Sequence, residues 1–71
     1  MDSERGVTAT ERLRVAKGWS RERLAGEAGL SLATVERIEQ GRTPQVTTAV
    51  KIAGALGVSI ADLFPVEEAV L

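Results

Sequence analysis

Residues 19–42 read Trp-Ser-Arg-Glu-Arg-Leu-Ala-Gly-Glu-Ala-Gly-Leu-Ser-Leu-Ala-Thr-Val-Glu-Arg-Ile-Glu-Gln-Gly-Arg, and their pattern predicts two short helices joined by a tight turn. Ser20 and Ser31 precede the two helical patterns, and a serine hydroxyl at such a position can accept a hydrogen bond from a free backbone N–H. Gly29 and Gly41 follow the patterns, and glycine readily adopts the left-handed backbone that ends a helix. This arrangement is typical of a helix-turn-helix motif, whose second helix can enter the major groove of DNA.

The glycines, caps and apolar positions continue in a fixed order beyond this motif. The order is Ser20-x-x-x-Leu24-Ala25-x-x-Ala28-Gly29-Leu30-Ser31-x-x-Thr34-Val35-x-x-Ile38-Glu39-x-Gly41, then Pro44, then Ala53-x-Ala55-Leu56-Gly57-Val58-Ser59-Ile60-x-Asp62-Leu63-Phe64. From about Thr10 to Phe64 it resembles the lambda-repressor/Cro-like (XRE-type, Cro/C1-type) helix-turn-helix family of transcriptional regulators. The resemblance implies an all-α fold of five helices, with the helix-turn-helix at the second and third.

We expect one domain, because the chain has only 71 residues. Residues 1–9 are predicted to form an N-terminal arm and the start of the first helix. Residues 10–64 are predicted to form the helix-turn-helix domain, and residues 65–71 a C-terminal tail.

Capping signals and stops predict the ends of each helix. Thr8 and Glu11 have the spacing of a capping box, as do Ser59 and Asp62. Gln45 is a poorer cap, so we expect the fourth helix to start late or to fray. The expected helices run from about residue 8 to Gly18, over about 21–28, over about 32–40, from 46 or 47 to 56, and from 59 to 64.

Apolar spacing predicts which side chains form the core. On the first helix, Leu13 and Ala16 are expected to face inward, with Val15 left open. A lone Trp19 could stack on a DNA base, but we favour core packing because of the large apolar area of a tryptophan. On the fourth helix, the expected apolar face consists of Val50, Ile52, Ala53 and Leu56.

Composition narrows the possible functions. The chain has no Cys and no His, which removes the usual zinc ligands, the thiol nucleophile and the imidazole base. No Gly-rich phosphate loop is present, so we expect no enzyme activity, no cofactor and no metal. No segment is apolar enough for a membrane span or a signal peptide, and a cytoplasmic protein is expected.

The charges are unevenly distributed along the chain. The formal net charge is −1, which is unusual for a DNA-binding protein. All nine basic residues nevertheless lie between Arg5 and Lys51, where only five acidic residues occur, so this segment carries +4. The flanks carry the other five acidic residues and no basic one. One basic face would produce this distribution, although a set of solvated helix faces would also do so.

Base-reading residues are expected on the outward face of the second motif helix, near its start. By position, the resemblance implies contacts from Ser31, Leu32, Ala33 and Arg37, and Thr34 lies on the same face. Arg37 can bind guanine through two hydrogen bonds, although it could also be a surface arginine paired within its helix. Leu32 and Ala33 are apolar, so they could contact thymine methyl groups but not hydrogen-bonding edges. Leu32 could equally pack on the following loop.

The resemblance also implies phosphate contacts and one structural ion pair. Arg21 and Arg42 are expected to be exposed cations near phosphates. Arg14 and Glu39 match a family pair that would clamp the third helix to the first. The remaining phosphate-contact positions are Ser20, Gln40 and Thr43.

Three functions remain in order of preference. The first is a homodimeric, sequence-specific regulator bound to double-stranded DNA, most simply a repressor. The second is a protein-interaction adaptor or antitoxin-like module with the same fold, which the acidic flanks and the apolar reading positions favour. The third and weakest is an enzyme, which the absence of His, of Cys and of a Gly-rich phosphate loop disfavours. Self-association is expected through apolar residues of the last helix and the tail: Ile60, Leu63, Phe64, Val66, Val70 and Leu71.

Overall fold

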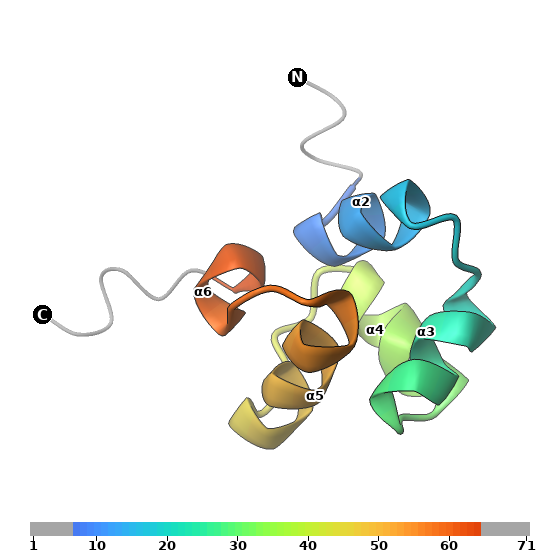
Figure 1. Ribbon diagram of the computed structural model, residues 1–71. Helices are drawn as coiled ribbons and strands as arrows, with labels where there is room; N and C mark the ends of the chain where they lie inside the picture. Colours follow the sequence, from blue (N-terminus) through green and yellow to red (C-terminus); the bar gives the residue numbers. More distant parts are fainter. Residues whose placement is uncertain (1–6, 65–71) are drawn as a thin grey trace, which may run out of the picture.

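The computed structural model describes residues 7–64, and this part of the chain is all-helical, with five helices and no strand. Figure 1 shows α4 beside α3 and α5, with α2 lying across one end of them. The all-α, five-helix prediction is therefore confirmed. The helices are α2 (Ala9–Ala16), α3 (Arg21–Ala28), α4 (Leu32–Glu39), α5 (Val46–Leu56) and α6 (Ile60–Leu63).

Side-chain caps begin four of these helices. The hydroxyls of Ser20 and Ser31 accept hydrogen bonds from backbone N–H groups three residues later, at 3.0 and 3.1 Å. Ser59 and Asp62 form the predicted capping box, with both reciprocal bonds present. At Thr8 the hydroxyl accepts from the Glu11 backbone N–H at 3.1 Å. The predicted starts of these helices therefore hold to within a residue.

The start of α5 agrees with the predicted start at residue 46 or 47. Gln45 makes no side-chain capping bond, yet the helix begins at Val46, directly after it. Val46 is the earlier of the two predicted starts, so the poor cap does not delay the helix, because packing of the buried face, rather than a cap, stabilises most helices in proteins. Ala49 and Ile52 lie on that buried face.

The turn between α3 and α4 depends on one glycine. Gly29 has φ 71°, in the left-handed region that side chains with a Cβ rarely adopt. The N–H of Leu30 donates to the carbonyl of Ala25 at 2.9 Å and closes the end of α3. The two helices of the motif are thereby held at a fixed orientation.

The core lies where α3, α4 and α5 meet. Leu24, Val35 and Ile52, one from each helix, have no exposed surface. Burying each such side chain contributes on the order of 1.5–3 kcal/mol to stability. Trp19 is half-buried and packs against the core, as predicted. The other buried members of this core cluster are Ala25, Ala28, Ile38, Ala53, Leu56 and Leu63.

Two helix faces differ from the prediction. On α2, Ala16 is exposed and Val15 is 58% exposed, while Thr10 and Arg14 are buried. Arg14 determines which face of α2 is buried, because its side chain points inward. The spacing of apolar residues cannot predict this, since arginine is polar.

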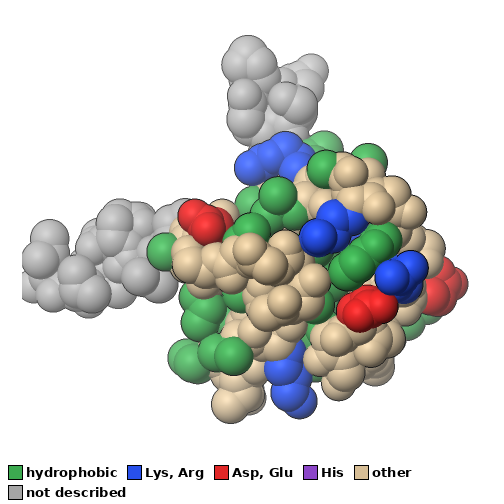
Figure 2. Space-filling view, viewed as in Figure 1, with side chains coloured by type: hydrophobic (Ala, Val, Ile, Leu, Met, Phe, Trp, Pro, Cys, Tyr) green, Lys and Arg blue, Asp and Glu red, His purple; other side chains and the backbone are tan. Residues whose placement is uncertain are grey.

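On α5, Val50 is 51% exposed and Ala49 is buried instead. The spacing of Ala49, Ile52, Ala53 and Leu56 forms one stripe on the helix, from which Val50 is rotated away. Figure 2 shows hydrophobic side chains gathered over α5 at the lower left of the view.

Some expectations concern residues outside the described part. Residues 1–6 of the predicted arm and the whole tail, including Val66, Val70 and Leu71, fall there. Of the predicted self-association residues within residues 7–64, Leu63 is only 6% exposed and belongs to the core, so it is not available to a partner. No helix between residues 7 and 64 has the length and hydropathy needed to span a membrane.

Candidate nucleic-acid interface

One side of α4 is buried and the other faces solvent. Val35, Ile38 and Glu39 point into the domain. Leu32 is 36% exposed, and Thr34 is half-buried. The exposed side carries half of the ten predicted contact residues: Ser31, Leu32, Ala33, Arg37 and Gln40. The structure thus brings the predicted base-reading residues together on one face.

Polar side chains link successive turns along α4. The Ser31 hydroxyl accepts from the Thr34 N–H and donates to the Thr34 hydroxyl oxygen at 2.9 Å. Arg37 Nη2 donates to the same hydroxyl oxygen at 3.5 Å, which is the outer limit of a hydrogen bond. Ser31 is therefore occupied as a cap, whereas the guanidinium of Arg37 is only weakly held and can rearrange toward a ligand.

A buried ion pair fixes the far end of α4. Arg14 Nε and Nη2 donate to the two carboxylate oxygens of Glu39 at 2.7 and 3.2 Å. The Nη1 group of Arg14 donates to the carbonyl of Trp19 at 2.7 Å. The side chains of Arg14 and Glu39 are 10% and 2% exposed. The predicted clamp between the first and third helices is confirmed.

Arg21 joins the same carboxylate. Its Nε donates to Glu39 Oε1 at 2.9 Å, while its side chain stays 45% exposed. The hydrogen bond to Glu39, and then the attraction of its charge, raise the pKa of Arg21 above the usual value for arginine. One carboxylate thus faces two guanidinium groups, so the cluster keeps a net positive charge. Arg21 is exposed as predicted, and its ion pair with Glu39 is a contact that the sequence did not indicate.

Two hollows lie along α4 on neighbouring faces. The first, about 290 Å³, is lined by Arg21, Glu36, Glu39 and Gln40. The second, about 370 Å³, lies between the end of α4, the following loop and the start of α5. It brings together Arg37, Arg42 and Thr43, and its other lining residues are Thr34, Ile38, Pro44, Gln45 and Thr48. The predicted phosphate-contact residues are therefore split between the two hollows, except Ser20, which caps α3.

Gln45 and Thr48 line the second hollow but were not predicted as contact residues. Gln45 leaves the first turn of α5 without a side-chain cap. Free backbone N–H groups at a helix start attract anions, and two arginines lie beside this one. The poor cap at Gln45 is the sequence signal for this open helix start, although on its own it indicates only a frayed helix.

Trp19 lies beneath two cations. The Nζ atom of Lys17 is 5.1 Å from the centroid of the Trp19 ring, and the guanidinium carbon of Arg23 is 4.8 Å from it. Arg23 also pairs with Glu27 at 2.8 Å. These contacts occupy the ring and agree with its packing role rather than with base stacking.

Comparisons with known proteins agree with this architecture. The family model described as helix-turn-helix matches residues 11–63, about three quarters of the chain. Among solved structures, the chain resembles a hypothetical transcription factor, NHTF, from Neisseria, with 36% sequence identity and a TM-score of 0.70. The similarity covers 94% of this chain and 81% of that one. No curated protein sequence matches the chain. With its all-helical fold and its matched motif, the chain belongs to the helix-turn-helix family, of the XRE type.

Proposed function

We propose that the protein is a cytoplasmic transcriptional repressor that binds a specific double-stranded DNA site as a homodimer. The proposal rests on the exposed face of α4 and on the hollow beside it, which is lined by Arg37 and Arg42 and by no acidic residue. The similar Neisseria protein is a hypothetical transcription factor, which supports the same class of function. No catalytic step, cofactor or metal is part of the proposal.

In the proposed complex, α4 lies in the major groove. Arg37 binds the O6 and N7 atoms of a guanine, because its weak bond to Thr34 is readily exchanged. Leu32 and Ala33 contact thymine methyl groups, since both are exposed at the start of the helix. Sequence recognition therefore depends on one arginine and on the shape of the DNA, more than on several amide side chains.

Phosphate contacts come from the hollows beside α4. Arg42 and Thr43 bind one phosphate together with the uncapped start of α5. On the other side of α4, Arg21 and Gln40 face the second strand of the DNA. Glu39, which also binds Arg14, holds Arg21 in place. Ser20 acts by capping α3.

The regulator is proposed to repress by covering a promoter. Two copies related by a two-fold axis would place their α4 helices about 34 Å apart, one turn of the duplex. Ile60 and Phe64 are half-buried and keep some surface for self-contact, unlike Leu63.

Binding of labelled duplex DNA by the full chain at several salt concentrations tests this proposal. The dissociation constant should rise steeply with salt, because each contacted phosphate releases counterions. Sedimentation of the complex should give two protein chains per duplex site. Salt-independent or absent binding would contradict the proposal.

The adaptor or antitoxin-like alternative rests on a specific observation. Apolar side chains are exposed at Leu32, Val46 and Val50, and such groups also suit a protein partner. This alternative predicts no salt-dependent retention on duplex DNA, so the same titration distinguishes the two functions.

A further inference from the structure

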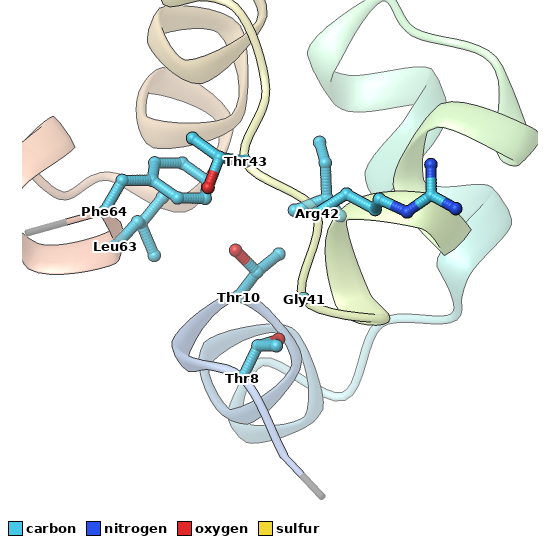
Figure 3. A pocket seen from close by; sticks show the side chains of 8 residues that line it. Thr8, Thr10, Gly41, Arg42, Thr43, Leu63 and Phe64 are labelled. Atoms are coloured by element: carbon cyan, nitrogen blue, oxygen red, sulfur yellow. The ribbon is translucent and has the colours of Figure 1, made fainter. Parts of the chain in front are cut away.

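A half-open pocket of about 250 Å³ lies on the opposite side of the α4–α5 loop from α3. Figure 3 shows it between the start of α2, the residues that follow α4, and α6. Ile38, Leu63 and Phe64 supply apolar walls, and Thr8, Thr10 and Thr43 supply hydroxyl groups. None of the helix-turn-helix contacts described above requires this space.

Thr10 is the unusual member of the lining. It is 1% exposed, and its hydroxyl oxygen is a buried polar atom without a hydrogen-bond partner in the described structure. The hydroxyl cannot bond to a preceding helical turn, because Thr10 is only the second residue of α2. Figure 3 shows the hydroxyl directed into the pocket. Since an unpaired buried hydroxyl is costly, the pocket is expected to receive a polar atom at this point.

The rest of the lining defines the chemistry of that occupant. The Thr8 oxygen already accepts from the Glu11 N–H, so its hydroxyl can still donate. Arg42 also lines the pocket, but its guanidinium points away from it in Figure 3. No other charged residue occurs among the described lining residues. The walls therefore favour an uncharged molecule with an apolar body.

We propose that this pocket binds a small, uncharged organic molecule whose single carbonyl or hydroxyl oxygen pairs with Thr10. The volume equals roughly eight water molecules at their liquid volume of about 30 Å³, which admits a ring or chain of about five or six carbons. The site does not depend on the proposed DNA binding. It does adjoin the interface, because Ile38 belongs to α4, and because Arg42 and Thr43 line both this pocket and the second hollow.

The test uses the full 71-residue protein labelled with ¹⁵N and titrated with cyclopentanone. Saturable amide shifts are expected at Thr10, Gly41 and Leu63. Cyclopentanecarboxylate, which has the same ring and a negative charge, should give no saturable shifts there at the same concentration. Absence of saturation with cyclopentanone, or equal binding of the carboxylate, would overturn the proposal.

Variants separate the hydroxyl from the shape of the pocket. Thr10→Val keeps the volume and removes the hydroxyl, so cyclopentanone affinity should fall about three- to tenfold, as expected for one lost hydrogen bond. Thr10→Ser keeps the hydroxyl and should retain affinity within about twofold, which keeps the test valid if Thr10→Val fails to fold. Thr47→Val, exposed on α5, is the matched control and should bind like the wild type.

A crystal structure of the protein soaked with cyclopentanone completes the test. The carbonyl oxygen is expected within hydrogen-bond distance of the Thr10 hydroxyl. An ordered water alone at Thr10, with cyclopentanone absent or bound elsewhere, would contradict the proposal, as would unchanged affinity in Thr10→Val.

Discussion

Arg14 and Glu39, which are 25 positions apart, form a two-point ion pair at 2.7 and 3.2 Å inside the domain. The pair joins the last turn of α2 to the last turn of α4. Arg21 adds a bond from the first turn of α3 to the same carboxylate. Three helices therefore meet at one side chain, and the orientation of the exposed face of α4 depends on it.

Removing the charge of Glu39 should destabilise the fold strongly. Glu39→Gln leaves the buried guanidinium of Arg14 without a counter-charge, which is expected to cost about 3–5 kcal/mol in the free energy of unfolding. The matched control is Glu27→Gln, since Glu27 pairs with Arg23 at the surface and such pairs contribute only about 0–1 kcal/mol. Urea unfolding measures both. Equal losses in the two variants would show that the Glu39 cluster is not a special support.

Substituting two leucines of the motif should affect different properties, stability for Leu24 and DNA binding for Leu32. Leu24 has no exposed surface, so Leu24→Ala should cost about 2–5 kcal/mol in unfolding free energy. Leu32 is 36% exposed, so Leu32→Ala should cost less than about 1 kcal/mol but weaken DNA binding. Thermal unfolding and duplex titration separate the two readouts. If Leu32→Ala unfolds early and binds DNA normally, Leu32 packs on the domain instead of contacting bases.

Arg42 should contribute affinity without sequence preference. Arg42→Ala is expected to weaken binding to specific and scrambled duplexes by similar factors and to reduce the slope of log affinity against log salt by about one. Arg12→Ala makes the same change of charge on α2, outside both hollows of α4, and should leave the slope almost unchanged. An equal change in both variants would indicate that only net charge matters.

Local signals predicted much of the fold. Ser20, Ser31 and Ser59 cap helices as expected, and Gly29 and Gly57 end them in the left-handed conformation. These features depend on residues within a few positions of one another, so the sequence displays them directly. The helix ends and the exposed face of α4 follow from such signals, whereas the five-helix fold was implied by the family resemblance.

The ion-pair partners of polar side chains that are distant in sequence were harder to predict. The Arg14–Glu39 pair was anticipated only through the family resemblance, and the bond from Arg21 to the same carboxylate was missed. A long arginine can reach several acidic residues, and its choice depends on the three-dimensional arrangement of the helices. On α2, Arg14 and Thr10 point inward, so Ala16 is exposed although it was predicted to face the core. The uncapped start of α5 was likewise not predicted as an anion site, because only the folded loop brings Arg42 beside it.

Sequence-specific reading by Arg37 is tested by selecting bound sequences from a random duplex pool with the wild-type protein and with Arg37→Ala. We expect the wild type to enrich a two-fold site containing a guanine in each half. Arg37→Ala should lose the preference at that guanine alone, at a cost of about 1–3 kcal/mol, while the other positions persist. Identical enriched sites for both proteins would show that Arg37 does not read a base. No enrichment by the wild type would contradict sequence-specific DNA binding and favour the adaptor function.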